Sequence, residues 1–151
     1  MKKILFLTAA LLLIAICITC VGCVSQIEDT NGESDTSLCS ITDQDIVKGN
    51  SAVSVGSVSN MRNDRGTLSV NKFSGVQTVD TINVRDVAES VTCTVTVESG
   101  NFRVVIVRDG KIYADMKTDG APNTITLTEP GKYDLKIAGE SAKFEMEYKI
   151  K

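Results

Sequence analysis

The chain has 151 residues, and its 16 basic and 19 acidic side chains give a net charge of −3. Aromatic residues make up 5% of the chain, and Trp and His do not occur in it. This composition excludes imidazole-based acid–base or metal chemistry and provides few platforms on which sugars or bases stack. A mildly acidic chain without a basic stripe also argues against nucleic acid as a partner.

The first 22 residues have the plan of a secretory signal peptide. Lys2 and Lys3 form a positive start, and residues 4–21 are an apolar run of 18 without a charge. A run of this length also approaches that of a membrane-spanning helix, so an uncleaved N-terminal anchor is the alternative. Either interpretation places the remaining residues outside the cytoplasm.

The apolar run ends in the sequence CVGC at residues 20–23, where the small Gly22 precedes Cys23 and a polar stretch follows. This leader resembles that of bacterial lipoproteins, in which the Cys after the cleavage point receives a diacylglyceryl thioether. At Cys20 the sequence departs from the family's pattern, which has an aliphatic residue there. The resemblance implies a signal peptide over residues 1–22, lipidation of Cys23 and a lipid anchor on the extracytoplasmic side of the cell membrane.

Residues 24–64 contain seven acidic residues against Lys48 and Arg62, eight Ser and no aromatic residue. Such a composition buries too little apolar surface to offset the entropy lost on ordering. We therefore expect residues 23–64 to be the lipidated Cys followed by a flexible acidic tether. A weak alternation at residues 52–58 leaves open a short strand near its end.

Residues 65–151 carry 12 basic and 12 acidic side chains and read as strand after strand, separated by turn residues. The expected strands begin at Thr67, Val79, Ser90, Phe102, Lys111, Asn123, Lys132 and Ala142. The pattern predicts an all-β domain over residues 65–151. Its expected form is an antiparallel β-sandwich, immunoglobulin-like or jelly-roll-like, with about eight strands.

Alternation assigns faces to several of these strands. The last one is expected to bury Phe144, Met146, Tyr148 and Ile150. Residues 104–107, VVIV, are apolar on both faces and predict a central strand that is covered on each side. Cys93 occupies an inward position, which favours a buried free thiol there and an exposed one at Cys39. A disulfide between the two is the alternative outside the cell.

Two turns have specific signatures. Asp109 and Gly110 stand where a two-residue type I′ hairpin turn requires them. Tyr133 follows Pro130 and Gly131 at a spacing similar to the tyrosine corner of immunoglobulin-like sandwiches, whose hydroxyl bonds to backbone upstream. The segments KFSGVQTVDTINV, VESGNFRVVIVRDGK and GKYDLKIAGESAKFEMEY resemble uncharacterised small exported domains of Gram-positive bacteria. That resemblance covers residues 71–149 and implies no activity.

The sequence predicts neither a catalytic nor a metal site, and no cofactor. The acids at residues 28–35 and 43–45 cluster oxygen ligands, but their spacing is not that of an EF-hand loop. Residues 69–72, SVNK, and 117–120, KTDG, are similar to two elements of penicillin-recognising enzymes. The Ser-Asp-Asn element that those enzymes also need does not occur.

Three functions remain open. The first is a lipid-anchored, non-catalytic binding module for an envelope protein or a wall polymer. The second is a small extracellular hydrolase with carboxylate chemistry, because acid pairs cannot be recognised without distances. The third is an accessory subunit of an envelope assembly that docks by an exposed strand edge.

Overall fold

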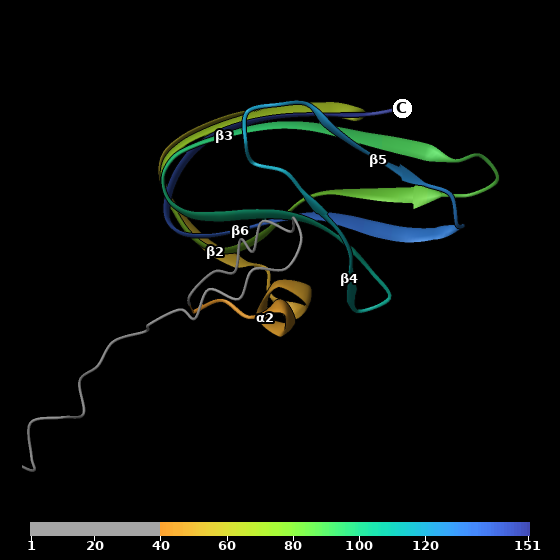
Figure 1. Ribbon diagram of the computed structural model, residues 1–151, viewed down its shortest axis with the longest axis horizontal. Coiled ribbons are helices and arrows are strands. Elements are labelled where there is room, and N and C mark those ends of the chain that lie inside the picture. Colours follow the sequence, from red (N-terminus) through yellow and green to blue (C-terminus); the bar gives the residue numbers. More distant parts are fainter. Residues whose placement is uncertain (1–39) are drawn as a thin grey trace, which may run out of the picture. The chain divides into compact units, whose positions relative to one another are not determined.

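The computed structural model describes residues 40–151, which form one short helix and six strands (Figure 1). The elements in chain order are α2 (Asp43–Lys48), β1 (Ser51–Arg62), β2 (Arg65–Val84), β3 (Glu89–Arg108), β4 (Lys111–Met116), β5 (Asn123–Leu127) and β6 (Gly131–Ile150). The strands pair in the order β1-β2-β6-β3-β4, and β5 lies beside the first half of β3. Every pairing is antiparallel, so the predicted all-β antiparallel class is confirmed.

The strand count differs from the expected eight because β2, β3 and β6 are each 20 residues long. Each of them joins two segments that the sequence pattern separates. The described residues therefore form six strands in one connected, open sheet. Ser99 and Gly100, which resemble a turn in the sequence, lie inside β3 and bend it without ending it.

The three long strands bend at the same level of the sheet. The register shifts around Phe73 and Gly75 where β2 pairs with β6, and around Ser99 where β3 pairs with β6. Gly75, Gly100 and Ser141 have φ values of 113°, 77° and 51°. Positive φ values of this kind are typical of β-bulges, which bend a strand and increase its twist. Figure 1 shows the consequence, since β2, β3 and β6 turn together and the sheet folds over itself.

The bend creates two arms that share one apolar core. The first arm consists of the first halves of β2 and β3 and the second half of β6. The second arm consists of the other halves of these three strands. The core takes Val91 and Val95 from the first arm and Val104 and Ile106 from the second. Tyr148 of the first arm donates a hydrogen bond of 3.0 Å to Asp80 Oδ2 of the second. The two arms therefore face each other.

Three phenylalanines fill the inside of the bend. Phe102 and Phe144 are stacked with ring centroids 3.9 Å apart, and Phe73 meets them edge-on at 6.3 and 5.9 Å. All three side chains are buried. Edge-on and offset-stacked pairs are the favoured arrangements of aromatic rings. These rings are the Phe residues of the chain after residue 22, so the largest apolar side chains of this part concentrate at the bend.

The predicted faces are confirmed where the pattern is clear. Phe144, Met146 and Tyr148 are buried in the core. In the second half of β3, Val104 and Ile106 point into that core, whereas Val105 and Val107 belong to a second cluster with α2. The strand through residues 104–107 is thus covered on both faces.

Both predicted turn features are present. Arg108 pairs with Lys111, and the two residues between them, Asp109 and Gly110, have φ values of 49° and 71° as a type I′ turn requires. Tyr133 Oη donates a hydrogen bond of 2.9 Å to the carbonyl oxygen of Glu129. Because β5 pairs within the first arm and β6 begins in the second, this bond fastens a connection between the arms.

The folded part of the chain begins upstream of the boundary expected at Arg65. α2 and β1 lie within residues 23–64, which the composition assigned to the tether. The short strand left open at residues 52–58 is the longer β1. Helical periodicity is not visible in α2 because six residues are too few to show a 3.6-residue period.

A glycine substitution tests how closely the backbones approach at the bend. A Cβ at Gly100 would lie 2.5 Å from the Ser141 carbonyl oxygen and 2.7 Å from Ala142 Cα. We expect Gly100→Ala to lower the free energy of unfolding by about 3 kcal/mol, through left-handed strain and overlap together. Urea denaturation measures the loss.

The matched control is Gly110→Ala, where φ is also positive but nothing lies within 4 Å of the added Cβ. Strain alone should cost about 1 kcal/mol there. Equal losses in the two variants would show that the backbones at the bend are not in close contact.

Candidate interaction surface

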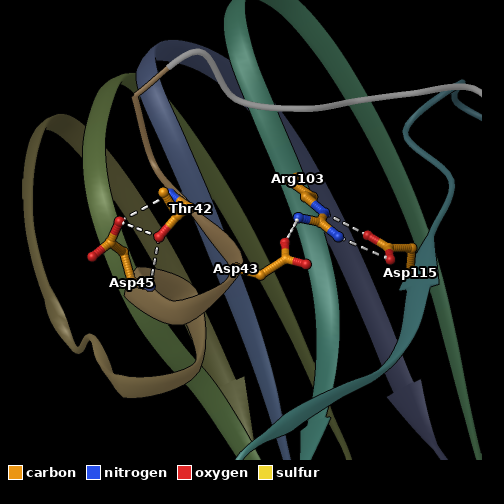
Figure 2. A network of polar contacts seen from close by, with 5 residues as sticks. All are labelled: Thr42, Asp43, Asp45, Arg103 and Asp115. Atoms are coloured by element: carbon orange, nitrogen blue, oxygen red, sulfur yellow. Dashed lines mark hydrogen bonds and ion pairs between the residues drawn. The ribbon is translucent and has the colours of Figure 1, made fainter.

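Helix α2 is defined by signals in its own sequence. Thr42 is the N-cap, and its N–H donates a hydrogen bond of 2.9 Å to Asp45 Oδ2, while the Asp45 N–H donates one of 3.3 Å to Thr42 Oγ1 (Figure 2). This reciprocal pair is a capping box. The hydrogen bonds from Thr42 lower the pKa of Asp45. Gly49 follows the last helical residue, so both ends of the helix are specified locally.

The helix covers the outer face of the second arm. Ile46 is its one buried residue, and it is fully buried. It belongs to a cluster with Val76, Val105, Val107 and Ala138. Without this contact four apolar side chains of the sheet would face water, so α2 completes the second arm.

Arg103 ties the start of α2 to the sheet. Its Nη1 donates to Asp43 Oδ1 at 2.5 Å, and its Nε and Nη2 donate to the two Asp115 carboxylate oxygens at 2.6 and 3.1 Å (Figure 2). The bidentate pair with Asp115 and the contact with Asp43 raise the pKa of the guanidinium. Asp43 is therefore paired with Arg103, and Asp45 is part of the helix cap.

Lys136 holds the other end of α2. Its side chain is buried, and Nζ donates to the carbonyl oxygens of Ile46, Val47 and Gly49 at 3.1, 2.8 and 3.0 Å. These are carbonyls that a helix C-terminus leaves without an intrahelical partner. Burial lowers the pKa of this ammonium group, and the charge of Asp134 opposes that effect. The ammonium thus anchors the helix end to β6.

An open groove of about 540 Å³ runs beside α2, and it is lined partly by Gln44, Asp45, Lys48 and Val76. It is a shallow surface depression, and Asp45 is already engaged in the helix cap. Within residues 40–151, no three His, Cys, Asp or Glu side chains are placed to hold a metal ion.

Among residues 40–151, strand β1 forms one edge of the sheet and pairs only with β2. All twelve of its residues are exposed, and none from Ser51 to Met61 is charged. The opposite edge consists of the shorter strands β4 and β5, of six and five residues. Proteins usually protect sheet edges by short strands, charges or Pro, because the unpaired N–H and C=O groups accept a further strand. β1 has none of these protections before Arg62.

The valine side chains of β1 point away from the core. Ser54, Ser57 and Ser59 pair with Phe73, Val70 and Leu68, which face the core, and directly paired residues share a face. Their neighbours Val53, Val55 and Val58 therefore lie on the outer face, where they are 70%, 59% and 72% exposed. The edge thus combines free backbone groups with an outward row of valines.

β1 follows the bend of the sheet, as Figure 1 shows. Gly56 has a φ value of 62°, and a Cβ there would lie 2.5 Å from Asn71 Nδ2. The positive φ allows Ser54 and Ser57 to share a face although they are three positions apart, and β2 changes alternation at the same place, so the β1–β2 register stays constant. β1 is therefore a bent edge whose alternation changes at Gly56.

The predicted thiols have different outcomes. Cys93 is fully buried, as predicted, and has no disulfide partner among the described residues, which do not include Cys39. Desolvation raises its pKa to about 12. A thiol in this state is protonated at neutral pH and is not a nucleophile. Cys39 and the expected lipidation site Cys23 lie outside the described residues.

No protein-family model matches the chain, and no curated protein matches its sequence. In the part of the chain from Ser40 onward, no helix is long and apolar enough to cross a membrane. Of the surfaces that the structure describes, β1 is the one whose residues contribute least to the buried core.

The anchoring of α2 can be tested at Lys136. Lys136→Met removes the donor to three helix carbonyls, so we expect a loss of about 1–3 kcal/mol in the free energy of unfolding. Amide hydrogens of Asp43–Lys48 should also exchange faster. Lys132→Met is the matched control, because this side chain of the same strand is 64% exposed. Unchanged exchange in α2 of the Lys136 variant would contradict the anchoring.

Proposed function

We propose that this chain is a non-catalytic interaction module of the cell surface, held on the extracytoplasmic side of the membrane by a lipid at Cys23. Its domain is a small two-layered β-sandwich that binds an envelope protein by pairing with β1. The observation that carries the proposal is the edge strand, which is twelve residues long, exposed throughout and uncharged up to Met61. Strand addition to such an edge gives affinity through main-chain hydrogen bonds.

The sequence of the leader supports the anchor. A positive start, an apolar run and a small residue before Cys23 are the elements that lipoprotein leaders share. Stable anchoring of a soluble domain takes two or more acyl chains, as a diacylglyceryl group provides. The acidic residues between Cys23 and Ser40 then serve as the spacer from the membrane.

The two other candidate functions have less support. Glycoside hydrolysis with carboxylates requires two acids that flank a substrate in a cleft. The neighbouring acids Asp43 and Asp115 both bind Arg103, and Glu129 binds Arg108. A sugar polymer is usually bound by exposed aromatic rings, whereas β1 presents valine and serine. A protein strand is the ligand that β1 suits best.

The anchor is tested by Cys23→Ser. The unaltered protein should partition into the detergent phase and should carry the mass of the lipid. The variant should appear in the aqueous phase or retain its leader, because it lacks the acceptor thiol. Equal membrane retention with unchanged leader processing would identify the apolar run itself as the anchor.

The edge is tested by photo-crosslinking in intact cells. A benzophenone amino acid in place of Val58 should give one discrete adduct, because its side chain would lie beside the added strand. The same residue in place of Val87, which is 77% exposed outside the strands, is the matched control and should give none.

A charge introduced on the edge provides a second test within this experiment. Val55→Lys should abolish the adduct from position 58, since lysine on an edge strand opposes strand pairing. Val87→Lys should leave it unchanged. No discrete adduct at position 58, or an adduct indifferent to Val55→Lys, would refute β1 as the binding edge.

A further inference from the structure

We propose that the strand added to β1 is the β1 of a second copy of this chain. The two strands would pair antiparallel about a two-fold axis that passes between Gly56 and Ser57. This inference rests on the proposed function, which identifies β1 as the binding edge. A two-fold contact of this kind uses the same surface on both subunits and closes on itself.

The bend of β1 limits which strand can pair with all of it. Ser57–Arg62 pair with the first half of β2, whereas Ala52 and Ser51 pair with Gly75 and Val76 beyond the bend. A straight segment with regular alternation can follow only one of these parts. A second β1 has its own change of alternation at Gly56, and an axis beside Gly56 brings the two changes of alternation opposite each other.

The position of that axis also aligns the strands completely. β1 runs from Ser51 to Arg62, so its midpoint lies between Gly56 and Ser57. An axis there pairs each residue of one copy with a residue of the other, beginning with Ser51 opposite Arg62. No residue of either edge is left without a partner.

The side chains are complementary in this register. Val55 of one copy stands opposite Val58 of the other, and both lie on the outer face. Ser54 stands opposite Ser59, and both lie on the inner face. The shift of alternation at Gly56 makes this match possible, because a strand with regular alternation in the same register would oppose inward and outward positions.

Charge and anchoring favour self-association. No like charges meet across the pairing, since residues from Ser51 to Met61 are uncharged. Pairing along a single strand buries less area than most stable dimers do. Attachment of both copies to one membrane raises their effective concentration, so a weak contact suffices.

Disulfide trapping tests the register in the full chain, in membrane vesicles. Cys39→Ser removes one thiol from the background, and Cys93 stays buried. One tagged copy carries Val55→Cys, and a second copy with a different tag carries Val58→Cys. Directly opposed Cβ atoms lie about 5 Å apart, within reach of a disulfide. Two copies of the same variant place their thiols about 10 Å apart along the strands.

We expect mild oxidation to link the two tags when both variants are present, and to give little dimer with either variant alone. A mixture of Val55→Cys and Val87→Cys copies controls for chance collision. Protection of Cys93 from a maleimide confirms that each variant is folded. Cross-linking that is absent, or equal in all combinations, would overturn the inference. A photo-crosslink from position 58 to a different protein would also overturn it, while the proposed function would stand.

Discussion

The fold depends on one constraint, namely that three long strands must bend at the same level without breaking their hydrogen bonding. Gly75 and Gly100 supply backbone conformations that residues with side chains rarely adopt. Phe73, Phe102 and Phe144 fill the space inside the bend. If the bends lay at different levels, the strands could not remain paired through them. The shared core, the bond from Tyr148 to Asp80 and the bent edge of β1 all follow from this arrangement.

The bend also explains why the chain upstream of Arg65 is folded. The outer face of the first arm is polar, with Thr92, Thr94 and Glu145 among its residues, and needs no cover. The outer face of the second arm carries Val105 and Val107, which α2 shields with Ile46. Arg103 and Lys136 fix that helix at its two ends. A segment with the composition of a tether is thus ordered by the face that it covers.

Local patterns predicted much of this structure. Alternation identified the inward residues of β6 and the doubly covered stretch at residues 104–107, because side-chain direction has a period of two in any strand. The Asp109–Gly110 turn and the Tyr133 hydrogen bond were predictable because each depends on a few adjacent residues. The same local view separated strands at Ser99–Gly100, since a bulge and a turn use the same residue types.

The candidate surface was less predictable. The signals of α2 were present in Thr42, Asp45 and Gly49, but only the apolar face of the second arm gives so short a helix a reason to form. The exposure of β1 depends on strand order, which alternation does not encode. A recurrent signal was available for the bend, because Phe73, Phe102 and Phe144 each lie within a few residues of Gly75, Gly100 or Ser141.

The interaction proposed for β1 requires the two arms to face each other, because only then is its edge bent. A nuclear Overhauser spectrum of the domain tests this most directly. We expect cross-peaks between the ring protons of Tyr148 and the β-protons of Asp80, whose side chains meet between the two arms. Cross-peaks from that ring only to its strand neighbours Gly66 and Cys93 would contradict the folded-over sheet.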